Sequence, residues 1–178
     1  MQSSLGVSDS LLRPLVLTGG PAIGKTTTGR LLAEGQARAA FIDVDDVRHL
    51  VVAGADAPWR SPHGTAQAAL AAENACGLAQ RFQIRGFDVV IADVLTPATS
   101  MIYRQELPTC LIVHLRADLD EARRRASTRK VWLTDEEFEL LHRRDQEMPP
   151  DVDARVEVAG LSVERQVATI ADLWSGRR

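Results

Sequence analysis

The chain has 178 residues, enough for one domain with a sizeable core that needs neither disulfides nor a structural metal. Its net charge of −3 argues against extended nucleic acid as the main partner, since such binding normally needs a broad basic surface. No apolar run approaches the about 20 residues of a membrane span, and Met1–Asp9 lacks the features of a signal peptide. We therefore expect a cytoplasmic protein without a membrane partner, with a flexible tail over residues 1–13 and one domain over residues 14–178.

Apolar runs of strand type alternate with helical segments along the chain, which predicts an α/β domain in three layers around a five-stranded, mainly parallel sheet. Strands are expected over residues 14–18, 39–43, 88–93, 110–115 and 154–158. Helices are expected over residues 25–37, 46–54, 64–85, 97–106, 118–130, 134–147 and 162–175. Capping boxes are predicted for Asp118 with Glu121 and for Thr134 with Glu137. The two cysteines, Cys76 and Cys110, lack metal-ligand spacing and are expected in the core.

The segment from Gly19 to Thr26, between the first strand and the first helix, fits the phosphate-binding pattern G-x-x-x-x-G-K-[ST]. Its glycines let the backbone curl so that successive N–H groups face an anion at a helix N-terminus. Lys25 would reach the β and γ phosphates, and the Thr26 hydroxyl would bind Mg²⁺. The alternative is a chance glycine-rich turn. The predicted nucleotide-binding residues of this segment are Gly19, Gly20, Pro21, Ala22, Ile23, Gly24, Lys25, Thr26 and Thr27.

Acidic residues follow the second strand, at the edge of the sheet where ligands collect in open α/β folds. Asp45 is predicted to take the proton from an attacking hydroxyl, because a carboxylate beside the γ-phosphate can act as a general base. Asp43 and Arg48 are assigned to substrate, and Asp46 to the cap of the next helix. The alternative is that these acids are solvated turn residues.

The third strand is an apolar run that ends in Asp93, the layout of a Walker B strand, and predicts that Asp93 contacts Mg²⁺ or substrate. The loop before the long third helix holds Trp59, Arg60 and His63, which are expected to contribute to substrate specificity. Trp59 could equally be a hydrophobic plug.

An arginine-rich helix follows the fourth strand. Arg125 and Arg129 are four residues apart and therefore share a helical face, where one could stack on a base and the other could neutralise the transferring phosphoryl group. Arg129 is the preferred catalytic arginine and Arg124 its rival. A solvated charged face, with Glu121 and Arg125 as a surface ion pair, is the alternative.

Together these segments resemble the P-loop small-molecule kinases, in the branch that contains chloramphenicol phosphotransferase, zeta-toxin-type kinases, gluconate and shikimate kinases and the polynucleotide 5′-kinase domain. The resemblance implies a P-loop NTPase fold that binds ATP and Mg²⁺. It supports Asp45 as general base and Arg48 as a substrate ligand, and it makes Arg125 and Arg129 similar to a lid pair that covers adenine and contacts phosphate. Residues 130–135 would form a short lid. The sequence Pro21-Ala22-Ile23 departs from the commoner serine-rich loop.

The leading hypothesis is an ATP-dependent kinase that phosphorylates a hydroxyl of a small molecule, such as an antibiotic or other secondary metabolite, a sugar acid or a nucleotide-sugar. One alternative is a kinase acting on nucleosides or on 5′-hydroxyl ends of polynucleotides. The acidic balance disfavours polynucleotide ends, but Arg48 permits them. The other is a regulatory nucleotide-binding ATPase with no small-molecule acceptor.

Overall fold

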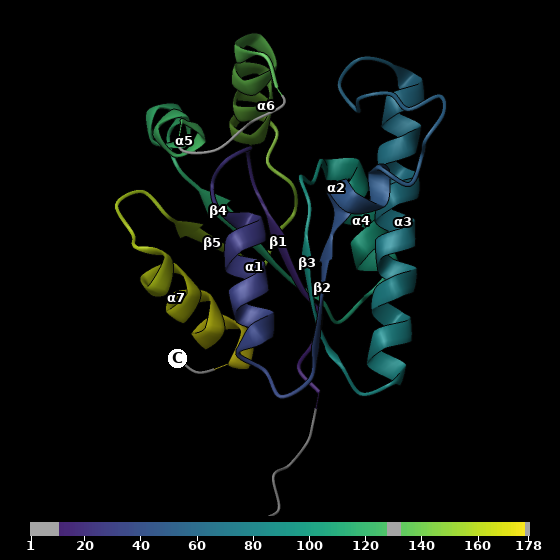
Figure 1. Ribbon diagram of the computed structural model, residues 1–178, viewed down its shortest axis with the longest axis vertical. Coiled ribbons are helices and arrows are strands. Elements are labelled where there is room, and N and C mark those ends of the chain that lie inside the picture. The colour runs from purple at the N-terminus through teal and green to yellow at the C-terminus, as the bar shows by residue number, and fades with distance from the viewer. Residues whose placement is uncertain (1–10, 128–132, 177–178) are drawn as a thin grey trace, which may run out of the picture.

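The sheet has five strands, and all of them are parallel in the computed structural model, which describes residues 11–127 and 133–176 (Figure 1). The strands are β1 (Leu15–Thr18), β2 (Ala39–Asp43), β3 (Asp88–Ala92), β4 (Leu111–Arg116) and β5 (Ala154–Glu157). Their spatial order is β2-β3-β1-β4-β5, so β1 lies at the centre and the chain crosses over it after β3. The predicted α/β class and parallel sheet are confirmed.

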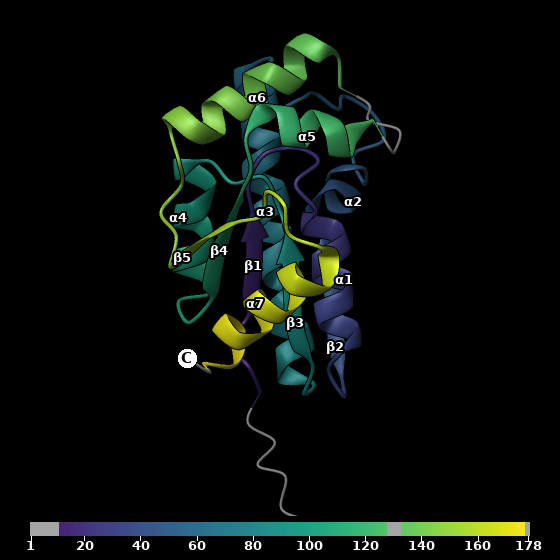
Figure 2. The same cartoon turned by 90° about the vertical axis from the view of Figure 1, so that its left-hand side faces the viewer.

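The described part of the chain has seven helices. They are α1 (Lys25–Glu34), α2 (Val44–Arg48), α3 (Pro62–Ile84), α4 (Pro97–Glu106), α5 (Leu119–Ala126), α6 (Asp135–Glu147) and α7 (Val163–Ser175). Helices α1 and α7 lie on one face, and α3 and α4 on the other, which gives three layers (Figures 1 and 2). Helices α5 and α6 lie beyond the carboxyl ends of the strands.

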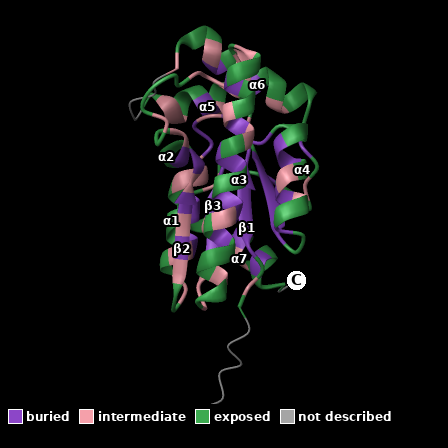
Figure 3. Cartoon of the chain, turned by 90° about the vertical axis from the view of Figure 1, so that its right-hand side faces the viewer, coloured by how far each residue is buried: buried purple, intermediate pink, exposed green. Residues whose placement is uncertain are grey.

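The three inner strands, β1, β3 and β4, are buried on both faces over most of their length, because helices cover each side of the sheet (Figure 3). The edge strands β2 and β5 are only partly buried. Val16 and Ile112 point to the face covered by α3 and α4, while their neighbours Leu15 and Leu111 point to the face covered by α1 and α7. On the α3 side the buried helix positions are small, including Ala72 in its middle, so the long helix can approach the sheet closely.

Helix α2 differs from its prediction. It spans Val44–Arg48, whereas the sequence predicted residues 46–54, and its cap is Asp43, whose side chain accepts a hydrogen bond from the Asp45 backbone N–H. The predicted cap Asp46 is wrong, since Asp46 lies within the first turn. The helix stops early because the residues beyond it, such as Val52 at 94% exposed, have no core against which a longer helix could pack.

The other caps follow the sequence more closely. Thr134 and Glu137 form the predicted reciprocal capping box at the start of α6. Asp118 caps α5 by accepting from the Glu121 backbone N–H, but the Glu121 carboxylate pairs with arginines of its own helix. Among the described residues, no helix is long and apolar enough to cross a membrane.

Candidate active site

The loop between β1 and α1 has the backbone that the phosphate-binding pattern requires. Gly19 has φ +133° and Gly24 has φ +97°, conformations that side chains disfavour. A Cβ atom at Gly19 would lie 2.2 Å from the Leu115 carbonyl oxygen, so the loop also needs glycine there for space. Ala22, with φ 62°, is the one non-glycine residue with positive φ in residues 11–127 and 133–176. The result is a tight curl that ends at the N-terminus of α1.

The Lys25 side chain contacts the backbone of this loop. Its ammonium donates hydrogen bonds to the carbonyl oxygens of Gly19 and Gly20, both at 2.8 Å. Burial lowers the pKa of Lys25 to about 8, and the charges of Asp45, Asp145 and other nearby carboxylates oppose that shift. A bound phosphate would take the place of these two carbonyl oxygens. Its full negative charge would interact more strongly with the ammonium than neutral carbonyl groups do.

Thr26 and Asp43 meet where β1 and β2 end. The Thr26 hydroxyl donates to Oδ2 of Asp43 at 3.0 Å, and Oδ1 of Asp43 accepts the α2 cap hydrogen bond. A hydroxyl beside a carboxylate is a suitable ligand pair for Mg²⁺, which in such sites takes most of its remaining ligands from nucleotide phosphates and water. No group of three or more His, Cys, Asp or Glu side chains in the described residues could hold a metal ion by itself.

Arg48 joins two carboxylates from different elements. Its Nη1 donates to Oδ1 of Asp45 and its Nη2 to Oδ1 of Asp93, each at 2.6 Å. The Asp93 carboxylate is completely buried and also accepts hydrogen bonds from the Tyr103 hydroxyl, at 3.0 Å, and from the Val94 backbone N–H. Burial raises the pKa of Asp93, and the nearby Arg48 charge opposes this rise. Asp45 is largely exposed, so its second oxygen faces a solvent-accessible region.

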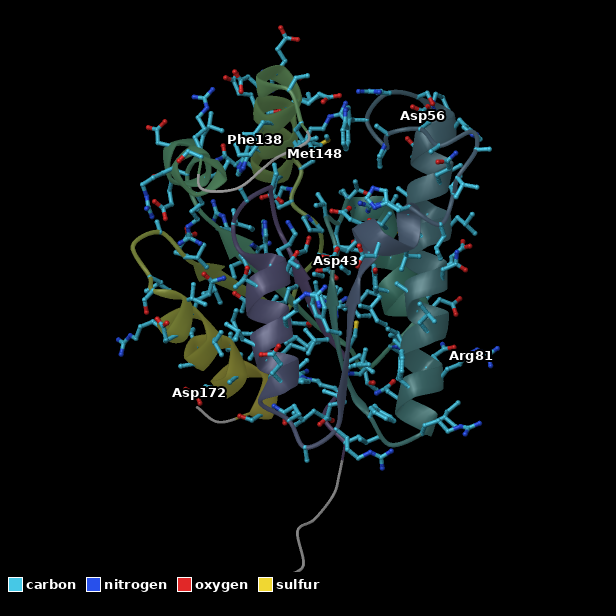
Figure 4. The ribbon with its side chains drawn as sticks, in the orientation of Figure 1. Asp43, Asp56, Arg81, Phe138, Met148 and Asp172 are labelled. Atoms are coloured by element: carbon cyan, nitrogen blue, oxygen red, sulfur yellow. The ribbon has the colours of Figure 1, made fainter. Side chains whose placement is uncertain are left out.

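These side chains line one cleft of about 630 Å³ at the carboxyl ends of the strands. In Figure 4, Asp43 lies below the space between Asp56, in the segment before α3, and Met148, at the end of α6. The predicted site residues that line the cleft are Pro21, Ala22, Gly24, Lys25, Thr26, Asp43, Asp45, Arg48, Trp59, Arg60 and Asp93. The structure thus brings most of the predicted residues together, from four separate segments.

Other predicted residues lie elsewhere. Gly19, Gly20, Ile23 and Thr27 are in the same loop and helix start but do not line the cleft. His63 lies in the first turn of α3, where its Nε2 contacts Gln67, and it is also outside the cleft lining.

The arginines of α5 have different surroundings. Arg125 lies behind the phosphate loop, where Nη1 donates to the Ile23 carbonyl at 3.1 Å, Nη2 to the Val158 carbonyl at 2.6 Å and Nε to Glu121 at 2.7 Å. Arg124 pairs with Glu121 at the exposed surface. The predicted catalytic Arg129 and residues 130–132 of the predicted lid lie outside the described residues.

Helix α6 contributes residues that the sequence did not single out. His142 is buried, donates from Nε2 to the Pro21 carbonyl of the phosphate loop at 2.9 Å, and has a pKa lowered by burial. Asp145 lines the cleft and accepts from Nε2 of the buried His114 on β4, with both carboxylate oxygens at 3.0 Å. These contacts join residues far apart in sequence. The one signal in the sequence was that His142 and Asp145 lie in a predicted helix after the arginine-rich segment.

Trp59 and Arg60 attach the segment before α3 to α6. The indole N–H of Trp59 donates to Oε1 of Glu137 at 3.1 Å, and Arg60 donates to the same oxygen at 2.7 Å. Hydrogen bonds from Arg60 and Trp59 lower the pKa of Glu137 to about 2. We call this group, Trp59, Arg60 and Glu137, the rim clasp, because it closes one side of the cleft.

Comparison with known proteins identifies the fold. Neither a protein-family model nor a curated protein matches the chain. Solved structures that are similar include a sugar kinase from Janibacter sp. HTCC2649, with TM-score 0.69 and 16% identity over 93% of this chain and 95% of that chain. Shikimate kinase from Acinetobacter baumannii, in complex with shikimate, has TM-score 0.66 and 21% identity over 96% of each chain.

A third similar structure is the tunicamycin resistance protein of Deinococcus radiodurans, with TM-score 0.64 and 15% identity over 93% of this chain and 96% of that chain. All three match nearly the whole length of the chain. The chain therefore has the α/β fold of P-loop small-molecule kinases, which confirms the predicted fold and the resemblance on which it rested.

Proposed function

We propose that this protein is an ATP-dependent kinase that transfers the γ-phosphoryl group to a hydroxyl of a small molecule. The observation that carries the proposal is that Lys25 and Thr26 of the phosphate loop line the same cleft as Asp45. A phosphate site and a solvent-accessible carboxylate in one cleft are the two parts that phosphoryl transfer to an alcohol requires.

Each charged group has a place in this proposal. Lys25 would stabilise the negative charge on the β and γ phosphates, and Asp45 would orient the acceptor hydroxyl and take its proton. Arg48 would hold Asp45 in place through the 2.6 Å contact. Arg129 as the arginine that covers the transferring group, and Arg125 as a nucleotide contact, remain predictions from the sequence.

The residues present also fit Mg²⁺. Thr26 and Asp43 would hold it, since their oxygens are adjacent and near the phosphate loop, whereas the buried Asp93 carboxylate already binds Arg48, Tyr103 and a backbone N–H. Bound with the nucleotide, Mg²⁺ would neutralise phosphate charge. We therefore favour Asp43 over Asp93 as its carboxylate ligand.

The similar structures support a small-molecule acceptor, because they include a sugar kinase and a shikimate kinase. ATP as the phosphoryl donor rests on the same resemblance. The acidic net charge of the chain counts against polynucleotide ends as acceptors.

The test compares Asp45→Asn with Asp46→Asn. Both residues are exposed neighbours in α2, but only Asp45 lines the cleft. Acceptor-dependent ADP release should fall by about 10²–10⁴ in Asp45→Asn, with nucleotide affinity kept, and should be unchanged in Asp46→Asn. Nucleotide hydrolysis that needs no acceptor and is insensitive to Asp45→Asn would indicate a regulatory ATPase and contradict the proposal.

A further inference from the structure

Two arginines of the cleft lining, Arg48 and Arg60, are already paired with carboxylates of the protein. Arg48 lies 2.6 Å from both Asp45 and Asp93, and Arg60 lies 2.7 Å from Glu137. A guanidinium that binds a substrate carboxylate needs free donors in the fork that faces the ligand. Both terminal nitrogens of Arg48 bind carboxylates of the protein, and Nη2 of Arg60 binds Glu137, so the charge of each guanidinium is already compensated before an acceptor enters the cleft.

The balance of charge along the described cleft lining points the same way. Its cations are Lys25, Arg48, Arg60 and Arg144. Its carboxylates are Asp43, Asp45, Asp93, Glu137 and Asp145, one more than the cations. A nucleotide bound beside Lys25 adds further negative charge, only part of which Mg²⁺ would neutralise. A carboxylate or phosphate on the acceptor would therefore enter a region of like charge, which costs binding free energy.

Arg144 differs from Arg48 and Arg60. It is exposed, on α6, and among the described residues it is the cleft arginine with no ion pair. Because Arg144 is exposed to water, where the dielectric constant is high, an ion pair between it and an anionic acceptor would contribute little binding free energy. Its neighbour Asp145 also lines the cleft, which offsets its charge.

Apolar side chains make up much of the remaining cleft lining. Side chains of this kind come from three separate segments and lie partly or fully out of solvent except at the mouth: Pro58, Trp59, Leu95, Leu133, Leu141 and Met148. Such walls gain free energy by covering an apolar or aromatic body and gain little from a densely hydroxylated one.

From this pairing, charge balance and lining, we infer that the acceptor is an alcohol without negative charge that carries an apolar or aromatic body. This inference rests on the proposed kinase function and selects among its candidate acceptors: it disfavours sugar acids and nucleotide-sugars. In the reaction, the acceptor oxygen forms a bond to the γ-phosphorus as the bond from that phosphorus to the β,γ-bridging oxygen breaks. The hydroxyl proton passes to Asp45, and ADP and the phosphate monoester are released.

The experiment uses pairs of probes that differ in charge but keep the same body. One pair is methyl 3-phenyllactate and 3-phenyllactate; the other is methyl shikimate and shikimate. For each probe we would measure binding by thermal shift with a non-hydrolysable ATP analogue and Mg²⁺ present, and kcat/KM from ADP release with saturating ATP. The ratio within a pair isolates the effect of one negative charge.

The expected result is a kcat/KM at least about tenfold higher for the neutral member of the pair that binds better. A ratio near one, or a preference for the acid, would overturn the inference. So would the absence of binding by every probe while the nucleotide analogue itself gives a shift. Asp45-dependent turnover of the acid would overturn the inference and leave the kinase function standing, whereas no nucleotide shift at all would remove both.

A substitution in the rim clasp tests whether the pairing of Arg60 with Glu137 causes the preference for a neutral acceptor. Glu137→Gln keeps an oxygen that can accept the capping hydrogen bond from the Thr134 N–H but removes the charge that neutralises Arg60. The neutral-to-acid ratio should fall several-fold in Glu137→Gln. Glu136→Gln, an exposed neighbour outside the cleft lining, is the matched control and should leave the ratio unchanged. Arg144→Ala should keep the neutral preference, and loss of acid turnover in that variant alone would show an anion site at Arg144 and contradict the inference.

Discussion

The Nη2 of Arg48 lies 2.6 Å from Oδ1 of Asp93, although 45 positions separate the two residues in the sequence. This contact ties the short helix α2 to the end of β3. Since the other terminal nitrogen of Arg48 binds Asp45, the position of the predicted general base depends on a buried carboxylate that directly follows β3. Asp93 and Tyr103 are therefore positioning residues in the proposed mechanism.

Removing the Asp93 carboxylate should destabilise the fold and reduce turnover together. Asp93→Ala leaves Arg48 mostly buried without its main partner, which we expect to cost about 3–5 kcal/mol in the free energy of unfolding. Tyr103→Phe removes one hydrogen bond to the same carboxylate and should cost about 1.5–3 kcal/mol. Urea unfolding measures the free energy of unfolding of both variants, and acceptor-dependent ADP release measures their turnover. If Tyr103→Phe is as stable as the wild type, the hydrogen bond to Asp93 does not contribute as described.

Nucleotide affinity should depend on pH through Lys25. Its pKa is lowered to about 8 by burial, so in the free protein the ammonium loses its proton as pH rises through about 8. Because bound phosphate requires the charged form, the dissociation constant for Mg²⁺-ATP should increase from pH 7 to pH 9 and approach a tenfold change per pH unit above the pKa. Lys25→Arg stays charged and should give a weaker but nearly pH-independent affinity. An equally flat profile in the wild type would contradict a lowered pKa.

Gly20 and His142 should be coupled energetically. A Cβ atom at Gly20 would lie 2.7 Å from Cε1 of His142, so Gly20→Ala forces the imidazole or the loop to move. We expect a loss of about 1–3 kcal/mol in stability and weaker nucleotide binding. His142→Ala alone loses the hydrogen bond to the Pro21 carbonyl but provides the missing space. The double variant should therefore be less impaired than the sum of the two single variants, whereas strict additivity would show that the loop does not rest on His142.

Arg125 should support the phosphate loop from behind. Arg125→Met removes donors to the Ile23 and Val158 carbonyls, so both the free energy of unfolding and nucleotide affinity should fall, with the ratio of ATP to GTP affinity unchanged. Arg124→Met, whose charged group pairs with the same Glu121 at the surface, is the control and should have little effect. A changed ATP to GTP ratio without loss of stability would favour the base-stacking role predicted from the sequence.

Features set by neighbouring residues were predictable. The order and type of the strands and helices, and the curl of the loop at Gly19 and Gly24, follow from apolar patterning and from backbone conformations that favour glycine. The meeting of Thr26 with the acids after β2 follows from parallel strands that end at one edge.

Features set by contacts between distant segments were not predictable. Asp93 pairs with Arg48 because the two are buried together, while its sequence pattern equally suited a metal ligand. His142 and Pro21 are 121 positions apart, and no spacing within α6 marks the residue that faces the phosphate loop. Helix α2 ends at Arg48 because the residues that follow it have no core to pack against. The local helix propensity of the sequence does not reveal this.

Transfer of phosphate from ATP to an alcohol in this cleft is tested most directly by following the phosphate itself. The protein would be incubated with ATP labelled at the γ-phosphate, Mg²⁺ and methyl 3-phenyllactate or methyl shikimate, and the products separated. We expect label in an organic phosphate monoester, in equal amount to the ADP formed, and its loss in Asp45→Asn. Label that appears only as inorganic phosphate, at the same rate with and without the alcohol, would contradict this expectation.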